Sequence, residues 1–587
     1  MAATRGDFVS NLGRIYGIYT GGFIGFVIIL AILEQVGVPN KVIGYLFMFL
    51  TILVYAVIGI IARTAQVSEY YVAGRRVPAF YNGMATAADW MSAASFIGMA
   101  GTLYALGYDG LAFVLGWTGG YVLVAVLLAP YLRKFGAYTV PDFLGARYGG
   151  NVARLLGILV LMAASFTYVV SQVYGVGIIV TRFLGLQFEI AVFVGLVGIL
   201  VCSMLGGMRA VTWTQVAQYV ILIIAYLLPV VILSAQITGV PVPQLMYGEI
   251  LQKVGELEKT LGVAKAHVEP FLTYDPLNFF GLIFCLMLGT AALPHVLMRY
   301  FTTPSVREAR LSVGWSLLFI FLLYFTAPAY AVFAKYEVYS SVLGQPIASL
   351  PAWVAAWGET GLVAIKDANG DGILQFAELT INNDVIVLAT PEIAGLPYVI
   401  AGLVAAGGLA AALSTADGLL LAIANALSHD VYYRMVDPTA GTKRRLIVAR
   451  VLLIGVAILA AIVAGTKPAG ILAMVAWAFS IAASGLFPAL VMGVWWKRTT
   501  STGAICGMAA GFGICLFYLI GTQYFAMPLW FGVRNISAGL FGIPVAFLVT
   551  WIVSLMTAAP SREMQDFIDA VRIPRGGTLM EEKKSTA

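Results

Sequence analysis

Charged residues are scarce in this sequence. Asp, Glu, Lys and Arg make up 11% of its 587 residues, whereas a soluble chain of this length carries about 25%. A large soluble core under a charged surface is therefore excluded. The net charge of +6 does not favour nucleic acid as a partner either, because the basic residues lie between apolar runs.

Histidine and cysteine are also rare, with three and four copies. All the cysteines lie inside apolar runs, namely Cys202, Cys285, Cys506 and Cys515. We expect them to be small core residues, and we predict neither a disulfide framework nor a cysteine-based metal site. No pairing of nucleophile and base stands out, so the sequence does not indicate an enzyme.

Long apolar runs are what the sequence has in excess. Hydrophobic residues make up 61% of the chain, and about 20 of them in succession form a helix that crosses a bilayer core. The runs predict an all-α, polytopic membrane protein with about fourteen transmembrane helices. We place these at 14–36, 41–62, 80–107, 111–132, 150–184, 188–207, 211–238, 276–302, 309–335, 395–432, 444–465, 471–496, 500–521 and 537–558.

Basic residues predict the orientation of these helices. With the N-terminus inside, most of the 34 Lys and Arg residues lie on the inner side, as they do in inner-membrane proteins. We therefore expect a bacterial inner (plasma) membrane protein with both termini cytoplasmic and without a cleaved signal peptide. Two long loops, 239–275 and 336–394, then face outward. The remaining tail, 559–587, is charged, and we expect it to be mobile and without recognisable chemistry.

Two of the predicted helices are interrupted. The segment 84–101 contains an acid, hydroxyls and glycines, and the segment 289–299 contains Gly, Thr and Pro in mid-span. They open two five-helix sets, 80–238 and 276–496, that begin on opposite sides. This is the pattern of an inverted 5+5 repeat with a binding site at mid-membrane. The alternative is that Gly and Pro are simply common in membrane helices.

Further helices flank this repeat. Residues 1–65 hold two peripheral N-terminal helices, and 497–558 hold two C-terminal helices.

Hydroxyls and acids inside the helices suggest an ion site. Ser414 and Thr415 are adjacent, and hydroxyl and freed carbonyl oxygens suit a hard cation such as sodium. The alternative is that these hydroxyls bond to their own or a neighbouring helix. Asp89 and Asp417 lie within spans, where charge is costly; each either tunes an ion site, carries a proton, or caps a broken helix end.

Several short segments resemble the sodium/solute symporter family. They are Tyr70-Tyr-Val-Ala-Gly-Arg75, Phe96-Ile-Gly-Met-Ala-Gly101, Gly206-Gly207 with Trp213-Thr214, Pro294-His295 with Arg299, and Ser428-His-Asp-Val-Tyr432. The stretch 289–302 looks most like the acetate permease branch. The resemblance implies the leucine-transporter fold and a sodium-coupled symporter that imports a small monocarboxylate such as acetate. It also implies that sodium is bound by the backbone carbonyls of Ala88, Met91 and Ala411 and by the hydroxyls of Ser414 and Thr415.

The sequence departs from the sodium–glucose cotransporters of that family. They have an Asp after the Trp-Thr pair, where this chain has Gln215, so a sodium-release step through that carboxylate is in doubt. Their sugar-binding polar residues correspond to small or apolar positions here, which are Ser95, Val114, Met287 and Thr290. A sugar is excluded because its hydroxyls would stay unpaired in such a pocket.

The substrate site is predicted around the broken helices, at Ser92, Ser95, Thr290, Trp477 and Ser480. We expect no Lys or Arg at mid-depth, with Arg299 at the headgroups, so a half-helix N-terminus, sodium and hydroxyls must attract a carboxylate. The alternatives are a symporter for another small solute such as an amino acid, or a transporter-like sensor. The expected partners are the solute, sodium and membrane lipid, and a small membrane subunit is compatible with the sequence.

The second outer loop contains a twelve-residue pattern at 367–378. Its oxygen-bearing positions match those of an EF-hand calcium loop, with Gly372 at the sharp turn. The predicted calcium ligands are Asp367, Asn369, Asp371, the carbonyl of Ile373, Gln375 and Glu378. A solvated acidic turn is the alternative.

Overall fold

The computed structural model describes residues 9–64, 66–573, 575 and 578–580, except the side chains of 201, 202 and 205. The expectation for Cys202 thus lies outside the described part, whereas Cys285 and Cys515 are buried and Cys506 is half-buried, all as free thiols.

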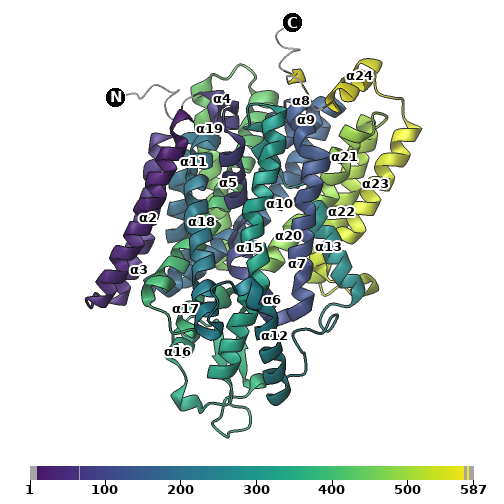
Figure 1. Ribbon diagram of the computed structural model, residues 1–587. Helices are drawn as coiled ribbons and strands as arrows, with labels where there is room; N and C mark the ends of the chain where they lie inside the picture. Colours follow the sequence, from purple (N-terminus) through teal and green to yellow (C-terminus); the bar gives the residue numbers. More distant parts are fainter. Residues whose placement is uncertain (1–8, 65, 574, 576–577, 581–587) are drawn as a thin grey trace.

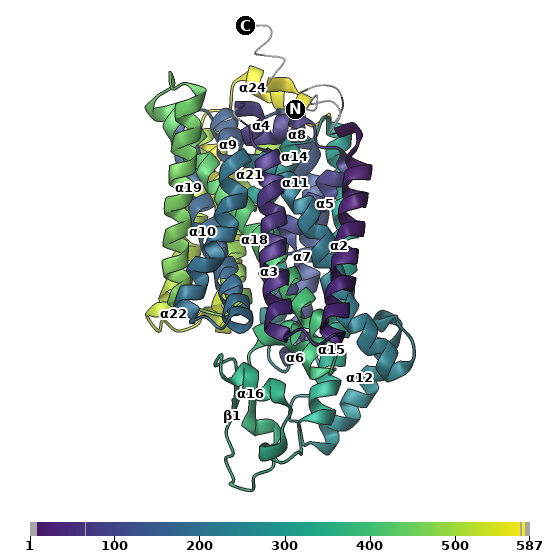
Figure 2. The same ribbon diagram turned by 90° about the vertical axis from the view of Figure 1, so that its left-hand side faces the viewer.

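The molecule is a bundle of long helices with a smaller lobe at one end (Figures 1 and 2). The N-terminal helices are α2 (Leu12–Gln35), α3 (Asn40–Ile61) and α4 (Val67–Val72). The next group contains α5 (Ala79–Trp90), α6 (Met99–Leu106), α7 (Leu111–Leu123), α8 (Ala129–Phe135), α9 (Val140–Tyr148), α10 (Asn151–Leu184) and α11 (Phe188–Thr238). Two π-helical turns join neighbours in this group, η2 (Ala94–Gly98) and η4 (Val124–Leu128).

The second half of the chain continues the bundle. Its helices are α13 (Pro276–Thr290), α14 (Pro294–Phe301), α15 (Val306–Ser341), α18 (Tyr398–Asn425), α19 (Thr442–Gly465), α20 (Ile471–Gly485) and α21 (Phe487–Trp495). The π-helical segment η8 (Ala426–Val436) extends α18. The chain then forms α22 (Ser501–Tyr524), α23 (Gly539–Met556) and α24 (Arg562–Val571).

The lobe is built from the two long loops. It contains α12 (Pro243–Thr260), α16 (Ala352–Gly358), α17 (Ile386–Ile393) and an antiparallel pair, β1 (Val363–Ile365) and β2 (Leu379–Ile381), in which Val363 is opposite Ile381. Short 3-10 turns complete the chain, at Ala73–Arg75, Gly107–Gly110, Ile347–Ser349, Phe376–Glu378, Asn383–Val385, Trp530–Gly532 and Asn535–Ser537 (η10). Both long loops lie at the end opposite α4, α8, α9 and α24 (Figure 1).

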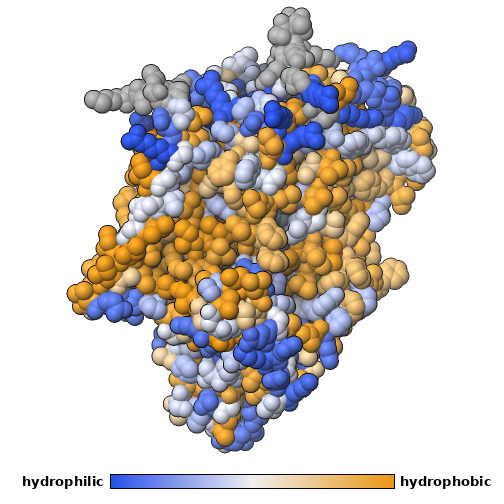
Figure 3. Space-filling view, viewed as in Figure 1, coloured by the Kyte–Doolittle hydropathy of each residue, from blue (hydrophilic) through white to orange (hydrophobic). Residues whose placement is uncertain are grey.

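The helices are those of a multi-pass membrane protein. Twelve segments among the described residues are long and apolar enough to cross a bilayer. The surface carries an apolar belt between two more polar ends (Figure 3). Large apolar side chains such as Phe49 and Leu53 of α3 are exposed. The all-α, polytopic prediction is therefore confirmed, while the count of fourteen and the inverted repeat stay predictions.

One long helix explains part of the difference in count. Helix α11 has 51 residues, with a non-helical Gly207 at φ 56° inside it. Straight, it would measure about 76 Å, more than twice a bilayer core of about 30 Å. Only glycine fits at the bend, because a Cβ on Gly207 would lie 2.6 Å from the carbonyl oxygen of Tyr70.

Both predicted interruptions are present. Helix α5 ends at Trp90, and η2 begins at Ala94. Helix α13 ends at Thr290, and α14 begins at Pro294, whose ring removes an N–H and ends the hydrogen-bond ladder. Helix α18 packs beside both breaks. The most apolar 18-residue stretch of the span that contains α18 is fully buried.

The C-terminal segment differs from our expectation of a mobile tail. Helix α24 buries Ile568 and Val571, and Lys134 Nζ donates to the carbonyl of Arg575 at 2.7 Å. The guanidinium of Arg133 donates to Thr578 Oγ1 at 2.5 Å. The described part of the tail therefore docks on the end of α8, because its apolar face needs burial and the basic end of α8 meets its free carbonyls.

Candidate ion and solute site

The break after α5 meets the middle of α18. Ser414 Oγ donates to the carbonyl of Ala88 at 2.7 Å and to that of Ala411 at 3.0 Å. Thr415 Oγ1 donates to the carbonyl of Asp89 at 2.7 Å, and both hydroxyl side chains are fully buried. Two adjacent hydroxyls and three carbonyl oxygens thus converge at one point, which is the donor set that a hard cation prefers.

This convergence brings together four of the five predicted sodium ligands. The exception is Met91, since the Thr415 hydroxyl bonds the carbonyl of Asp89, two residues earlier in α5. Close approach of the two helices depends on Gly418, where an added Cβ would lie 2.2 Å from Asp89 Oδ1. A small residue one turn from Ser414 therefore lets α5 reach the hydroxyls.

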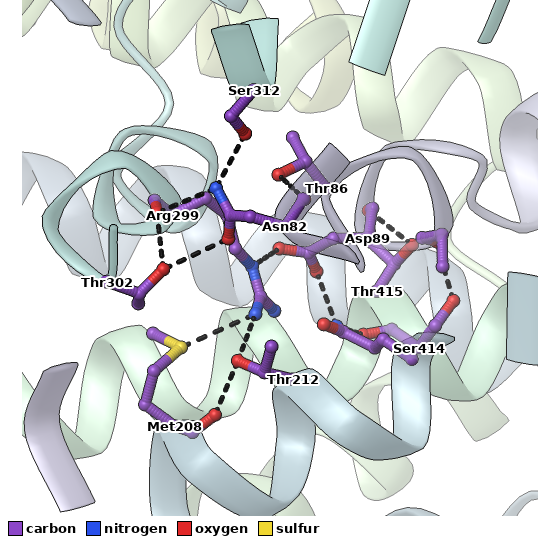
Figure 4. A network of polar contacts seen from close by, with 12 residues as sticks. Asn82, Thr86, Asp89, Met208, Thr212, Arg299, Thr302, Ser312, Ser414 and Thr415 are labelled. Carbon is purple, nitrogen blue, oxygen red and sulfur yellow. Dashed lines mark hydrogen bonds and ion pairs between the residues drawn. The ribbon is translucent and has the colours of Figure 1, made fainter. Parts of the chain in front are cut away.

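Asp89 pairs with an arginine from the other broken helix. Arg299 Nε donates to Asp89 Oδ2 at 2.9 Å, and the two side chains are 0% and 1% exposed. The second carboxylate oxygen accepts from Gln215 Nε2 at 3.2 Å, and the same Nε2 donates to the carbonyl of Ser414 at 2.7 Å. Figure 4 shows how this ion pair lies beside Ser414 and Thr415. It therefore joins α5, α11, α14 and α18 around the candidate ion site.

Further contacts of Arg299 correct our expectation for this residue. Its Nη1 donates to Thr212 Oγ1 at 3.2 Å and contacts Met208 Sδ at 3.4 Å, and Asn82 Nδ2 donates to its carbonyl at 3.2 Å (Figure 4). Arg299 is thus buried in protein and not at the headgroups, and the prediction of no arginine near the site was wrong. Burial is tolerated because Asp89 offsets the charge, while Nη2 is buried without a hydrogen-bond partner in the described residues.

Asp417 has different surroundings from Asp89. Its Oδ1 accepts a hydrogen bond from Ser203 Oγ on the first arm of α11, and its Oδ2 has no hydrogen-bond partner within the described part of the chain. Both acids are buried, Asp89 beside α18 and Asp417 within it. Asp89 is held as an ion pair, whereas Asp417 is held by a hydroxyl.

An aromatic cluster lies beyond the break of α5. We use this term for Trp90, Trp117, Tyr121, Tyr168, Tyr324 and Phe479, whose rings meet pairwise at centroid distances of 4.8–6.4 Å. Tyr168 donates to Ser92 Oγ at 3.1 Å, and the Tyr324 and Ser95 hydroxyls are 3.0 Å apart. The indole N–H groups of Trp90 and Trp117 are buried without a hydrogen-bond partner in the described residues. Apolar walls with a few polar donors are typical of small-molecule sites.

Only two of the five predicted substrate residues contact the aromatic cluster. Ser92 and Ser95 contact the aromatic cluster. Thr290 donates to its own helix, at the carbonyl of Leu286, 2.7 Å away. Trp477 and Ser480 bond instead to Asn535 at 3.4 Å and to the carbonyl of Ile536 at 3.0 Å, both in η10.

Helix geometry explains this division. At about 100° per residue, Trp477 and Ser480 of α20 point away from the face on which Phe479 meets Tyr168. Sequence reasoning missed Phe479 and Tyr168, and the signal that could have found Tyr168 is a hydroxyl in the middle of the apolar run 150–184.

The 367–378 loop is folded on itself in the lobe. Asp371 Oδ2 accepts from Asn369 Nδ2 and from Gln375 Nε2, each at 2.9 Å, so three predicted calcium ligands meet. A hydrogen bond from the backbone N–H of Ile373 lowers the pKa of Asp371 below its ordinary value. Glu378 accepts backbone N–H bonds from Ala368 at 2.8 Å and Gln375 at 3.0 Å. Asp367 accepts from the N–H groups of Gly370 and Gly372 at 2.8 and 3.1 Å.

Known proteins match most of this chain. The model of the sodium:solute symporter family matches residues 70–511. An uncharacterized symporter of Cupriavidus necator is 45% identical, over 95% of this chain and 98% of its own. The structure of a Na+-coupled sialic acid symporter in a substrate-bound outward-open state has a TM-score of 0.67 at 17% identity, covering 89% of this chain and 99% of that one. The fold is thus that of leucine-transporter-like carriers.

Proposed function

Given that the chain belongs to the sodium:solute symporter family, and is therefore a sodium-coupled transporter of a solute and not an enzyme, we propose that it imports a small monocarboxylate such as acetate by alternating access. The observation that carries this proposal is the buried contact of Ser414 and Thr415 with the broken end of α5. A solute held at that break shares a helix with the ion, so that each can favour the other's binding.

Sodium would be bound where these oxygens meet. Its ligands would be the hydroxyls of Ser414 and Thr415 and the carbonyls of Ala88, Asp89 and Ala411. Asp89 does not need to ligate the ion through its carboxylate, because that group already accepts from Arg299 and Gln215. Asp417 lies nearby and is the remaining candidate for tuning the ion.

The surroundings of the break favour one negative charge on a small solute. Arg299 is neutralised by Asp89, so attraction comes from sodium, from the start of α14 and from polar donors of the aromatic cluster. A methyl group or short chain would pack against the rings of the aromatic cluster. A second carboxylate would be a buried, unpaired charge, which costs several kcal/mol.

The test is uptake by the purified protein in liposomes, with and without an inward sodium gradient. We expect sodium-dependent uptake of labelled acetate or of a two- to three-carbon relative. Unlabelled short monocarboxylates should compete, and succinate and glucose should not. Competition by neutral amino acids without competition by acetate would overturn the proposed substrate in favour of an amino acid, and sodium-dependent binding without uptake would indicate a transporter-like sensor.

We also propose an orientation and a domain arrangement. The lobe formed by the two long loops faces outward from the bacterial inner membrane, and both chain ends face the cytoplasm. The repeats are 80–238 and 276–496, with 1–65 and 497–558 at the periphery. The start of α2 and the whole of α24 lie at the same end of the bundle, opposite the lobe (Figure 2), which supports this arrangement.

Calcium binding by the 367–378 loop is a separate proposal. It is supported by the convergence of Asn369, Asp371 and Gln375 and by the match to the EF-hand pattern. Glu378 would have to exchange its two backbone N–H bonds for bidentate contact with the ion. A loop on the outer face meets high calcium concentrations, so a weak structural site is sufficient.

A further inference from the structure

His295 is a buried imidazole that our sequence analysis left without a role. It is 1% exposed, and neither ring nitrogen has a hydrogen-bond partner in the described part of the chain. Burying a polar group without a partner costs roughly 1–3 kcal/mol. Such a side chain is retained more readily where a ligand supplies the missing hydrogen bond.

The ring of His295 contacts a tyrosine whose hydroxyl reaches the break of α5. It meets the ring of Tyr168 edge-on, with centroids 5.6 Å apart and an interplanar angle of 79°. The hydroxyl of Tyr168 in turn donates to Ser92, which lies between α5 and η2. His295 therefore faces the aromatic cluster from the other broken helix.

His295 also stands in the first turn of α14. Leu297 is the first residue of this helix whose N–H reaches a carbonyl of the helix start, that of Leu293, at 3.1 Å. Pro294 has no N–H, so the N–H groups of His295 and Val296 point out of the helix start. A helix N-terminus attracts anions through these groups and its dipole.

The arginine of the same helix does not offer its Nε to a solute. Arg299 lies one turn after His295 in α14, and its Nε is paired with Asp89. The carboxylate of a solute thus has two sources of donors at this point, the imidazole and the start of α14. The ring of Tyr168, whose hydroxyl donates to Ser92, lies against the same imidazole.

We propose that His295 anchors the carboxylate of the transported solute. One ring nitrogen donates to one carboxylate oxygen, and the free N–H groups at the start of α14 face the other. The inference rests on the proposed function and specifies which residue recognises the charged end of the solute. It makes His295 a specificity-determining residue, separate from the sodium ligands on α18.

The experiment compares His295→Leu, His295→Asn and His267→Leu with the wild type. Leu removes the donor at nearly the same volume, whereas Asn keeps a donor. His267 is a second buried histidine, placed in the outer lobe, and serves as the matched control. The measurements are the acetate KM, the maximal rate and the sodium concentration for half-maximal uptake, together with the melting temperature.

We expect His295→Leu to raise the acetate KM at least tenfold and to leave the half-maximal sodium concentration at saturating acetate within twofold. His295→Asn should recover part of the affinity, and His267→Leu should leave the KM unchanged. A wild-type KM in His295→Leu would overturn the inference. So would an equal loss in Leu and Asn variants that are as stable as the wild type.

The two proposals fail in different ways. If the wild type transports acetate and its KM does not depend on His295, only the anchor is wrong. If the wild type transports no short monocarboxylate, the proposed function and the anchor are both wrong. If His295→Leu does not fold, the test is competition by propionate in His295→Asn. Propionate should still compete with acetate there, because the retained donor should preserve selectivity for carboxylates.

Discussion

At the scale of single residues, the candidate ion site depends on two hydroxyl groups, each with a structural and a proposed ion-binding role. Ser414 and Thr415 each bond a carbonyl of the broken α5, so they hold two helices together and offer oxygens to an ion. The alternative explanation for such hydroxyls is that they only bond to their own helix. Ser414 does make such a bond, to the carbonyl of Ala411. Their position against a broken helix end is what distinguishes this pair.

Replacing both hydroxyls tests the ion site. We expect Ser414→Ala with Thr415→Ala to raise the half-maximal sodium concentration for uptake at least tenfold, because two ligands are lost. The acetate KM at saturating sodium should change less. Protein abundance in the membrane is measured alongside, and an unaltered sodium dependence in the double variant would rule out the site.

At the scale of elements, the Asp89–Arg299 pair joins the two broken helices. Removing one partner leaves a buried, uncompensated charge, which costs about 3–5 kcal/mol, whereas removing both costs less. We therefore expect Arg299→Gln and Asp89→Asn each to lower the melting temperature markedly. The double variant should be more stable than the sum of the single losses implies.

A double-mutant cycle of melting temperatures checks this expectation. Lys253 and Glu249 form an exposed pair at 2.7 Å on α12 and provide the control, because such pairs contribute only about 0–1 kcal/mol. Additive effects at Asp89 and Arg299 would show that the pair is not coupled.

The proposed calcium loop, 367–378, also belongs to the scale of elements, since β1 and β2 flank it. We expect millimolar calcium to raise the melting temperature of the wild type, because ligand binding to the folded state stabilises it. Glu378→Gln should remove most of this response, because position 12 supplies two oxygens. Magnesium at the same concentration is the control, and a wild type that does not respond to calcium would refute the proposal.

At the scale of the whole molecule, the polar lobe and the docked C-terminal helix lie at opposite ends of an apolar belt (Figures 1 and 3). The belt requires lipid around the middle of the bundle. The distribution of Lys and Arg then predicts which end faces the cytoplasm. A transporter that works by alternating access needs its site near the middle of the membrane, where the pattern of broken helices predicts it.

Cysteine labelling in intact cells tests this orientation. Ser349 in the lobe and Thr439 between η8 and α19 are both exposed. We expect Ser349→Cys to react with a membrane-impermeant maleimide from outside, and Thr439→Cys to react only after the membrane is opened. The native thiols described here are buried or half-buried, and the unsubstituted protein measures their background. The reverse pattern would invert the proposed topology.

Much of this molecule was predictable from the sequence because a bilayer permits few solutions. Backbone groups in hydrocarbon must bond internally, so apolar runs of span length become helices, and Pro294, with Gly289 before it, predicts a broken one. The positions of Ala88, Ala411, Ser414 and Thr415 followed from a resemblance in sequence. These residues come together when α5 and α18 pack against each other as the resemblance to that family implies.

What only the tertiary structure decided is the pairing of groups far apart in the chain. Arg299 alone predicts a headgroup anchor, because an isolated charge is too costly to bury; it is buried because Asp89, 210 residues away, lies within 2.9 Å. Trp477 and Ser480 have suitable chemistry but point toward η10, since the rotation of α20 is set by its neighbours. His295 gains its proposed role because Tyr168 and the break of α5 lie opposite it, and no local pattern encodes that arrangement.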